Sequence, residues 1–167
     1  LQQSSNWISA YLMSLYSPAQ LVSLMRSFGI QGQIDPVVSI CLGPCEVSVK
    51  EMVDAYTTFP NKGIRVDPLY VTRIEDKQGN VIASFTPQSR EIISELTSYK
   101  MIYMLQHVMD HGTGVRARYR YKLTMPAGGK TGTTQNNSDG WFVGFTPSLV
   151  SGCWVGGEDR SIHFDRM

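Results

Sequence analysis

The chain of 167 residues is long enough for one domain that buries roughly 70% of the surface exposed by its unfolded form. Hydrophobic residues make up 42% and charged residues 17% of the chain, a balance that excludes intrinsic disorder. The formal net charge of +1 gives no reason to expect global attraction to nucleic acid or membrane. No run approaches the roughly 20 apolar residues of a membrane-spanning helix.

Helical patterns occupy the first third of the chain. Residues 6–16 carry apolar side chains at helical spacing, and a second helix is predicted to begin at Ser17. Ser-Pro-Ala-Gln at that point combines a capping box with proline at the first helical position, and Gly29 is placed to end the helix. A second capping box at 48–51 predicts a helix through Phe59. The apolar residues expected to form the inner faces of the first two helices are Ile8, Leu12, Leu15, Leu21, Leu24 and Phe28.

The middle of the chain predicts a hairpin and one long helix. Residues 70–85 have the pattern of a β-hairpin around the turn 77–80. Residues 94–111 form the longest helical pattern, so the helical part extends to about residue 112. Its expected apolar side consists of Leu96, Tyr99, Ile102, Leu105 and Met109.

The last third changes to strand patterns, between about residues 125 and 157. Helices followed by antiparallel strands predict an α+β fold, an antiparallel sheet packed with helices. Trp141 and Phe142 are expected in the core of the second strand. The three predicted strands are 127–134, 140–146 and 149–156.

The three cysteines carry less information. Cys153 lies in an apolar, strand-like run, which predicts a buried free thiol. Cys41 and Cys45 are close enough in sequence to close a small loop in an oxidising compartment, and sequence leaves both the disulfide and the free thiols open.

The segment from Lys130 to Thr133 places a cation, hydroxyls and an unhindered backbone together. Glycine and β-branched residues disfavour a helix, so we expect a strand in which Lys130 and Gly132 share one face and Thr131 and Thr133 the other. Gly132 has no Cβ, so a ligand can approach the backbone closely. A phosphate-binding P-loop is excluded because that pattern requires glycine where the chain has Thr124.

Two short motifs together resemble those of a known family. Lys-Thr-Gly at 130–132 and Ser-Ser-Asn at 4–6 are similar to two of the three signatures of penicillin-binding proteins and serine β-lactamases. Thr133 and Thr134 resemble the class A, bifunctional penicillin-binding proteins. The third signature, S-x-x-K, is absent, because no serine here is followed three residues later by lysine. Further stretches similar to the family are 43–60, 104–114 and 140–147.

The resemblance implies roles for the matching residues. Ser4 would relay a proton toward the leaving group, and Asn6 would hydrogen-bond the substrate amide and orient the nucleophile's lysine. Lys130 would bind the terminal carboxylate of the substrate and support Ser4. Thr131 and Thr133 would provide hydroxyls near that carboxylate, and the Thr133 N–H would be one oxyanion donor. Gly132, inside the same motif, completes the expected substrate-binding set.

The resemblance also implies an activity, a place and partners. The expected reaction is acyl transfer from D-Ala-D-Ala stem peptides of peptidoglycan through a serine acyl-enzyme, inhibited by β-lactams and needing no cofactor or metal. Residues 1–167 would be one partial transpeptidase domain, incomplete at its N-terminal side and inactive alone. The nucleophile, a membrane anchor and a glycosyltransferase domain would lie upstream, with the parent on the outer face of the inner membrane. We also expect the partial domain to self-associate.

Three alternatives compete with this reading. A β-lactam sensor of the same fold would use the same motifs but retain a stable acyl-enzyme. His107 and His111 lie one helical turn apart, so both can face one metal ion, although no further ligand is evident. Residues 116–122 alternate cations with aromatic side chains, a pattern found on nucleic-acid-binding surfaces. At a net charge near zero, a solvated strand or loop is favoured for this segment, and a contact with anionic glycan-peptide substrate is the next reading.

Overall fold

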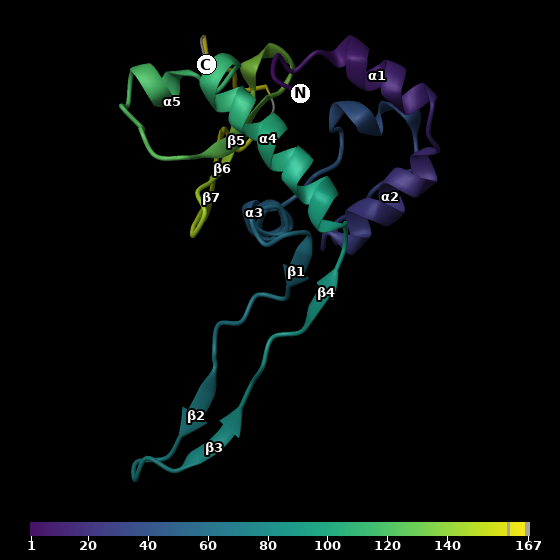
Figure 1. Ribbon diagram of the computed structural model, residues 1–167. Helices are drawn as coiled ribbons and strands as arrows, with labels where there is room; N and C mark the ends of the chain where they lie inside the picture. The colour runs from purple at the N-terminus through teal and green to yellow at the C-terminus, as the bar shows by residue number, and fades with distance from the viewer. Residues whose placement is uncertain (160, 166–167) are drawn as a thin grey trace.

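The computed structural model describes residues 1–159 and 161–165 and has the predicted α+β architecture (Figure 1). The first two thirds of the chain contain the longer helices and four short strands, and a three-stranded antiparallel sheet follows. Figure 1 also shows a long two-stranded arm that extends away from the helices and the sheet. Among the described residues, no helix combines the length and apolar character needed to cross a membrane.

The first helices enclose a small apolar core. Helix α1 spans Asn6–Ser14, α2 spans Pro18–Ser27, and the 3₁₀ helix η1 spans Val38–Leu42. Their predicted inner faces are largely wrong, because periodicity identifies a helix but not the element that covers it. Four of the six expected residues, Ile8, Leu12, Leu15 and Leu24, are 52%, 49%, 59% and 43% exposed. Only Leu21 and Phe28 lie partly buried against the core, as predicted. The buried core residues are Met13, Ile30, Ile34, Ile40 and Ala55.

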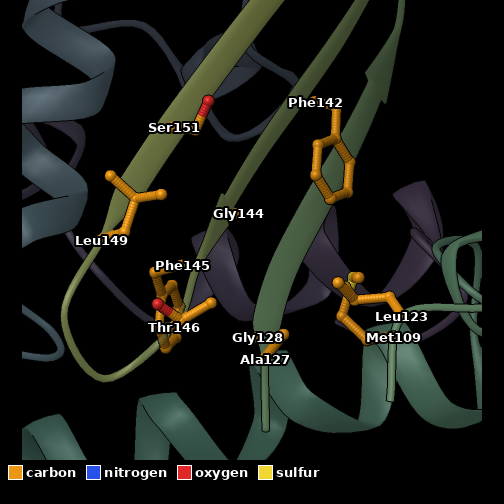
Figure 2. A pocket seen from close by; sticks show the side chains of 10 residues that line it. All are labelled: Met109, Leu123, Ala127, Gly128, Phe142, Gly144, Phe145, Thr146, Leu149 and Ser151. Carbon is orange, nitrogen blue, oxygen red and sulfur yellow. The ribbon is translucent and has the colours of Figure 1, made fainter. Parts of the chain in front are cut away.

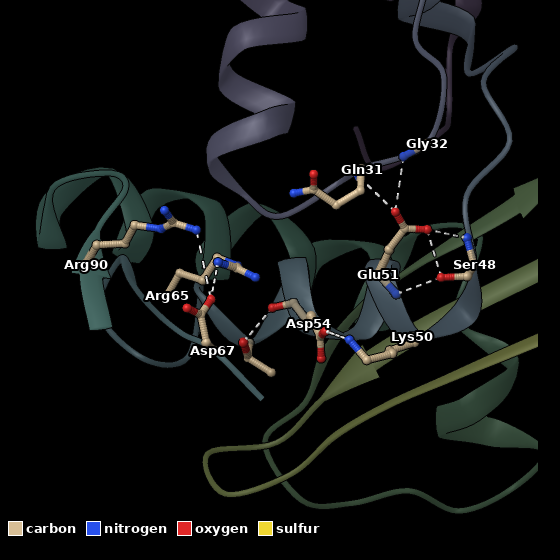
Figure 3. A network of polar contacts seen from close by, with 10 residues as sticks. Gln31, Gly32, Ser48, Lys50, Glu51, Asp54, Arg65, Asp67 and Arg90 are labelled. Carbon is tan, nitrogen blue, oxygen red and sulfur yellow. Dashed lines mark hydrogen bonds and ion pairs between the residues drawn. The ribbon is translucent and has the colours of Figure 1, made fainter. Parts of the chain in front are cut away.

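Helix α3, Val49–Thr57, begins at the predicted capping box (Figure 3). Ser48 Oγ accepts from the Glu51 N–H at 3.1 Å, and Glu51 Oε2 accepts from the Ser48 N–H at 2.9 Å. Glu51 Oε1 also accepts from the N–H groups of Gln31 at 2.7 Å and Gly32 at 3.3 Å. The Ser48 backbone bond, followed by that of Gln31, lowers the pKa of Glu51 to about 2. One carboxylate therefore joins α3 to the segment after α2.

The predicted hairpin is the outer part of the arm. Strands β2, Arg73–Glu75, and β3, Val81–Ser84, pair antiparallel around the predicted turn. At the base of the arm, strand β1, Ile64–Val66, pairs antiparallel with β4, Ser89–Glu91. The sequence did not predict this pair of strands. At this base Arg65 is buried and pairs with Asp67, as Figure 3 shows.

The sheet and the long helix α4, Glu95–His111, form the rest of the body. Strands β5, Gly128–Thr133, β6, Asp139–Phe145, and β7, Val150–Gly156, lie in that order, and each predicted strand is present to within one residue at either end. Helix α4 packs on β5, and α3 packs across β6 and β7. Of the predicted α4 face, Leu105 and Met109 are fully buried, whereas Leu96 and Tyr99 are exposed; Val108 and Ser98 are buried in their place.

An apolar pocket of about 140 Å³ lies between the end of α4 and the three-stranded sheet, with walls from β5, β6 and β7 (Figure 2). Met109, Gly128 and Phe142 contribute to its wall, so Phe142 is part of an apolar layer, as predicted, although Phe142 and Trp141 are only half-buried. None of the residues with expected catalytic or substrate-binding roles lines this pocket.

The cysteines differ from prediction in one respect. Cys153 is exposed on β7, an edge strand of the sheet on which the neighbouring Trp154 and Val155 are also 42% and 52% exposed. Cys41 and Cys45 are free thiols that pack against the apolar core of the first helices.

Replacing Glu51 with glutamine should lower the free energy of unfolding by about 1–2 kcal/mol at pH 7, after allowance for solvent screening. Since the folded pKa of about 2 lies below the ordinary 4.5, the stabilisation is complete above about pH 4.5 and is lost as the pH falls toward 2. Urea unfolding of wild type and Glu51→Gln between pH 7 and pH 3 measures this. Glu91→Gln, at an exposed carboxylate on β4, is the control; equal effects of both substitutions would contradict the prediction.

The chain should self-associate at high concentration. Helix α1 exposes Trp7 and Tyr11 to 82% and 60%, and Tyr16, two residues after its end, is 66% exposed. The outer edges of β5 and β7 have no partner strand among the described residues. Exposed apolar patches and open strand edges both favour association. Sedimentation velocity should show species heavier than 18.7 kDa, reduced in Trp7→Glu. A monomer at every concentration would show the idea to be wrong.

Candidate active site

Lys130 projects from β5, the edge strand of the sheet. The segment is extended, as its glycines and threonines predict, and Lys130 lies opposite Val143 of β6. The side chain is half-buried, and a Cβ on neighbouring Gly132 would lie 3.2 Å from the Trp141 Cβ. Glycine at 132 therefore also serves the packing of β5 on β6.

Ser4 reaches the sheet through the N-terminal segment. The Gln2 side chain donates to the His111 carbonyl at 3.1 Å, and the Thr113 N–H donates to the Gln2 carbonyl at 3.3 Å. A Cβ on Gly112 would lie 2.4 Å from that same carbonyl, so only glycine allows this approach. Ser4 itself has a φ of 50°, in the left-handed region that most side chains avoid. The end of α4 thus fixes the position and backbone of Ser4.

The structure brings Ser4 and Lys130 into contact although they are 126 positions apart in sequence. Lys130 Nζ donates to Ser4 Oγ and also to the Thr131 carbonyl at 2.6 Å. Burial lowers the pKa of Lys130. None of the described carboxylates forms an ion pair with Lys130, so its charge is available to an anionic ligand.

The two threonines of the motif lie on the opposite strand face from Lys130, as alternation predicts. Thr131 Oγ1 shares a hydrogen bond of 2.6 Å with Thr113 Oγ1, in the turn after α4. Thr133 is exposed. The Thr134 N–H bonds to the Asp139 carbonyl, and hydrogen-bonded pairs alternate along antiparallel strands. The Thr133 N–H therefore points to the open outer edge of β5, where a ligand oxygen can accept from it.

Asn6 lies at the start of α1, two residues beyond Ser4, and is exposed. Within the described chain, no hydrogen bond joins Asn6 to Ser4 or Lys130. The residues that sequence reasoning missed are Gln2 and Thr113. Thr113 lies in Gly-Thr-Gly, a stretch noted for family similarity without any role, whereas nothing in the sequence marks Gln2.

The two histidines of the metal alternative stack along the end of α4. Their rings lie 5.6 Å apart, and Tyr103 packs edge-on against His107 at 4.6 Å. In the described part of the chain, no group of three or more His, Cys, Asp or Glu side chains is placed to hold a metal ion. Asp110, between the histidines, pairs with Arg118 at 2.9 Å.

The basic and aromatic segment 116–122 begins as a short helix, so the expected strand or loop is wrong for its first half. Helix α5 spans Arg116–Tyr119, and its turn closes through backbone bonds such as Tyr119 N–H to the Val115 carbonyl. Arg118 donates to the carbonyls of Leu123 at 2.8 Å and Met125 at 2.6 Å, and so fixes α5 against the chain leading into β5.

Comparison with known proteins decides the family. The model of the penicillin-binding protein transpeptidase domain matches residues 1–151, a range that includes both Ser4 and Lys130. The chain belongs to the penicillin-binding protein transpeptidase family. The resemblance noted in the sequence is thereby confirmed.

Relatives and solved structures agree with this assignment. Penicillin-binding protein 1A of Aquifex aeolicus is 35% identical over 156 residues, covering 93% of this chain and 21% of the relative. Penicillin-binding protein 1A of Rickettsia conorii is 30% identical over 181 residues, covering 93% and 22%. The crystal structure of penicillin-binding protein 1A from Haemophilus influenzae superposes with a TM-score of 0.89 at 21% identity, over 99% of this chain and 30% of that one. The chain thus spans about a fifth of the length of these curated relatives.

Lys130 should lose its proton at a lower pH in the folded chain than in the urea-unfolded chain, because burial penalises the ammonium form and lowers its pKa. NMR titration of the Lys130 side-chain Cε and Hε signals, assigned with Lys130→Arg, measures the midpoint in both states. Since the unfolded chain keeps this proton to higher pH, the free energy of unfolding rises as the pH increases between the two midpoints. A folded midpoint at or above the unfolded one would contradict this effect of burial.

Proposed function

We propose that this chain supplies the carboxylate-binding side of a serine-type D-Ala-D-Ala transpeptidase site that cross-links peptidoglycan. The contact between Ser4 and Lys130 carries the proposal, because it unites two family motifs from opposite ends of the chain at one point. A half-buried cation without an acidic partner in the described structure suits the terminal carboxylate of a stem peptide or the carboxylate of a β-lactam.

The attacking serine comes from outside these 167 residues, since no S-x-x-K occurs among them. Its oxygen forms a bond to the carbonyl carbon of the penultimate D-Ala, and the terminal D-Ala leaves as its amine accepts a proton. Ser4 relays that proton, and the Lys130 ammonium stabilises the nearby oxygens. The acceptor amine of a second peptide then attacks the acyl carbon and forms the cross-linking amide, while the serine ester bond breaks and the proton of the amine returns to the serine oxygen.

The outer edge of β5 contributes to the same reaction. The Thr133 N–H donates to the oxyanion that forms as the carbonyl is attacked, and loss of one such donor typically costs about 100 to 1,000-fold in rate. Asn6 binds the substrate amide from the start of α1, and Thr131 and Thr133 provide hydroxyls near the carboxylate. Gly132 leaves the backbone open to the substrate.

The parent protein, in this proposal, is a class A penicillin-binding protein with a glycosyltransferase domain. It acts at the outer face of the bacterial inner membrane, anchored by a segment outside this chain. The family match over residues 1–151 and the similarity to two penicillin-binding proteins 1A support this assignment. Stem peptides and β-lactams are its proposed ligands.

A fluorescent penicillin should label the full parent protein but not the isolated chain, because the nucleophile is absent from it. Lys130→Ala in the parent should slow labelling by about 100-fold, through loss of the cation that binds the carboxylate. Stopped-flow fluorescence and gel quantification measure both rates.

Lys100→Ala in the parent is the matched control, since Lys100 is an exposed cation of α4 without an ion pair in the described structure. Adding an acceptor peptide amine should speed release of the acyl group from a D-Ala-D-Ala donor; a persistent acyl-enzyme would favour the sensor. Mass spectrometry that finds a penicilloyl adduct on the isolated chain would refute the placement of the nucleophile.

A further inference from the structure

Beyond the site itself, α5 and the three residues after it form an exposed basic and aromatic surface, called here the α5 surface. It consists of Arg116, Tyr119, Arg120, Tyr121 and Lys122, all of which are exposed. The two tyrosines are 61% and 72% exposed. The Arg120 guanidinium lies 5.8 Å from the centre of the Tyr121 ring. Exposed tyrosine and arginine side chains are enriched at the sites where proteins bind their partners.

The cations of the α5 surface have no counter-ions. Within the described residues, Arg116, Arg120 and Lys122 form no ion pair, whereas Arg118 between them is paired with Asp110. Residues 111–138 contain five of the fifteen Lys and Arg residues and none of the fourteen Asp and Glu residues. The rest of the chain therefore has ten cations and fourteen anions, a net charge of −4. Positive charge is concentrated on one part of a nearly neutral protein.

The α5 surface is held firmly and close to the candidate site. The bonds of Arg118 to the Leu123 and Met125 carbonyls fix α5 on the chain that enters β5. Three residues before α5, Thr113 bonds directly to Thr131 of the Lys-Thr-Gly motif. Figure 1 shows α5 beyond the C-terminal end of α4, and the N-terminus of the chain also lies near that end. Arg118 and Thr113 thus join the α5 surface to the chain that enters β5 and to the strand that carries Lys130.

We propose that the α5 surface binds carboxylates of the substrate peptide other than the terminal carboxylate held by Lys130. The inference rests on the proposed transpeptidase function and adds a second anionic subsite to it. Arginine and lysine side chains provide charged donors for carboxylates, and exposed tyrosines provide faces for the peptide between them. Nucleic acid is disfavoured as the ligand, because the net charge of −4 elsewhere offers a long polyanion no continuous basic track.

The test compares two D-Ala-D-Ala peptides with the full parent protein. One peptide has free side-chain carboxylates upstream of its terminus, and the other has the same sequence with those groups amidated. The variant Arg120→Gln/Lys122→Gln removes two charges from the α5 surface. Lys77→Gln/Lys100→Gln removes two exposed cations elsewhere, on the hairpin turn and on α4, and is the matched control.

The measured quantity is the ratio of kcat/KM for the carboxylate peptide to kcat/KM for the amidated peptide. Two exposed charge contacts should make this ratio about five- to tenfold higher in wild type than in the α5 variant, and high salt should reduce the difference. The ratio should be unchanged in the control variant. Because each variant is its own reference, a general loss of folding lowers both values and leaves the ratio intact.

Equal ratios in wild type and the α5 variant would overturn the proposal. So would a single-stranded oligonucleotide that binds wild type at physiological salt and loses binding in the α5 variant while the peptide ratio stays constant. Failure of the proposed function looks different: wild type would then neither react with penicillin nor turn over either peptide.

Discussion

One contact between an ammonium group and a hydroxyl, from Lys130 to Ser4, constrains much of the structure around it. Ser4 comes from the opposite end of the sequence, and the end of α4 holds the segment that carries it next to the sheet. Gly112 allows the Gln2 carbonyl to approach closely, and the Thr113 N–H donates to that carbonyl. Thr113 then bonds to Thr131 on the same strand as the cation. Helix α4 therefore serves as the common support of both motifs, which explains why its C-terminal half is its most deeply buried part.

The environment of Lys130 lowers the stability of the folded chain and favours the binding of an anion. Half-burial makes the charged form of the lysine costly, and a nearby carboxylate would offset that cost. The described structure places none there, and the sequence between residues 111 and 138 contains none to offer. The site thus retains an unsatisfied positive potential in the absence of ligand, and a bound anion both neutralises it and stabilises the fold.

Local chemistry predicted the local structure well, and long-range contacts account for what it missed. The three strands and the capping box of Ser48 and Glu51 follow from patterns a few residues long. The bonds from Gln31 and Gly32 to the same carboxylate do not, because they depend on how α2 and α3 meet. Likewise, the spacing of apolar residues identified α1 and predicted that Leu12 is buried, whereas in the described structure no other element covers Leu12 and it is exposed. The motif residues themselves were found only because a family pattern links distant segments.

The β2–β3 arm has a consequence for how such chains vary. Its base is closed by the β1–β4 pairing and by the bond from the Ile92 N–H to the Gly63 carbonyl at 2.9 Å. Beyond that closure, every residue of β2 and most of β3 is exposed, and none lies in the apolar core. Doubling the length of a flexible loop costs only about 0.6 kcal/mol. Insertions and deletions in the arm should therefore leave the candidate active site almost unchanged, so the length of the arm can vary in evolution independently of that site.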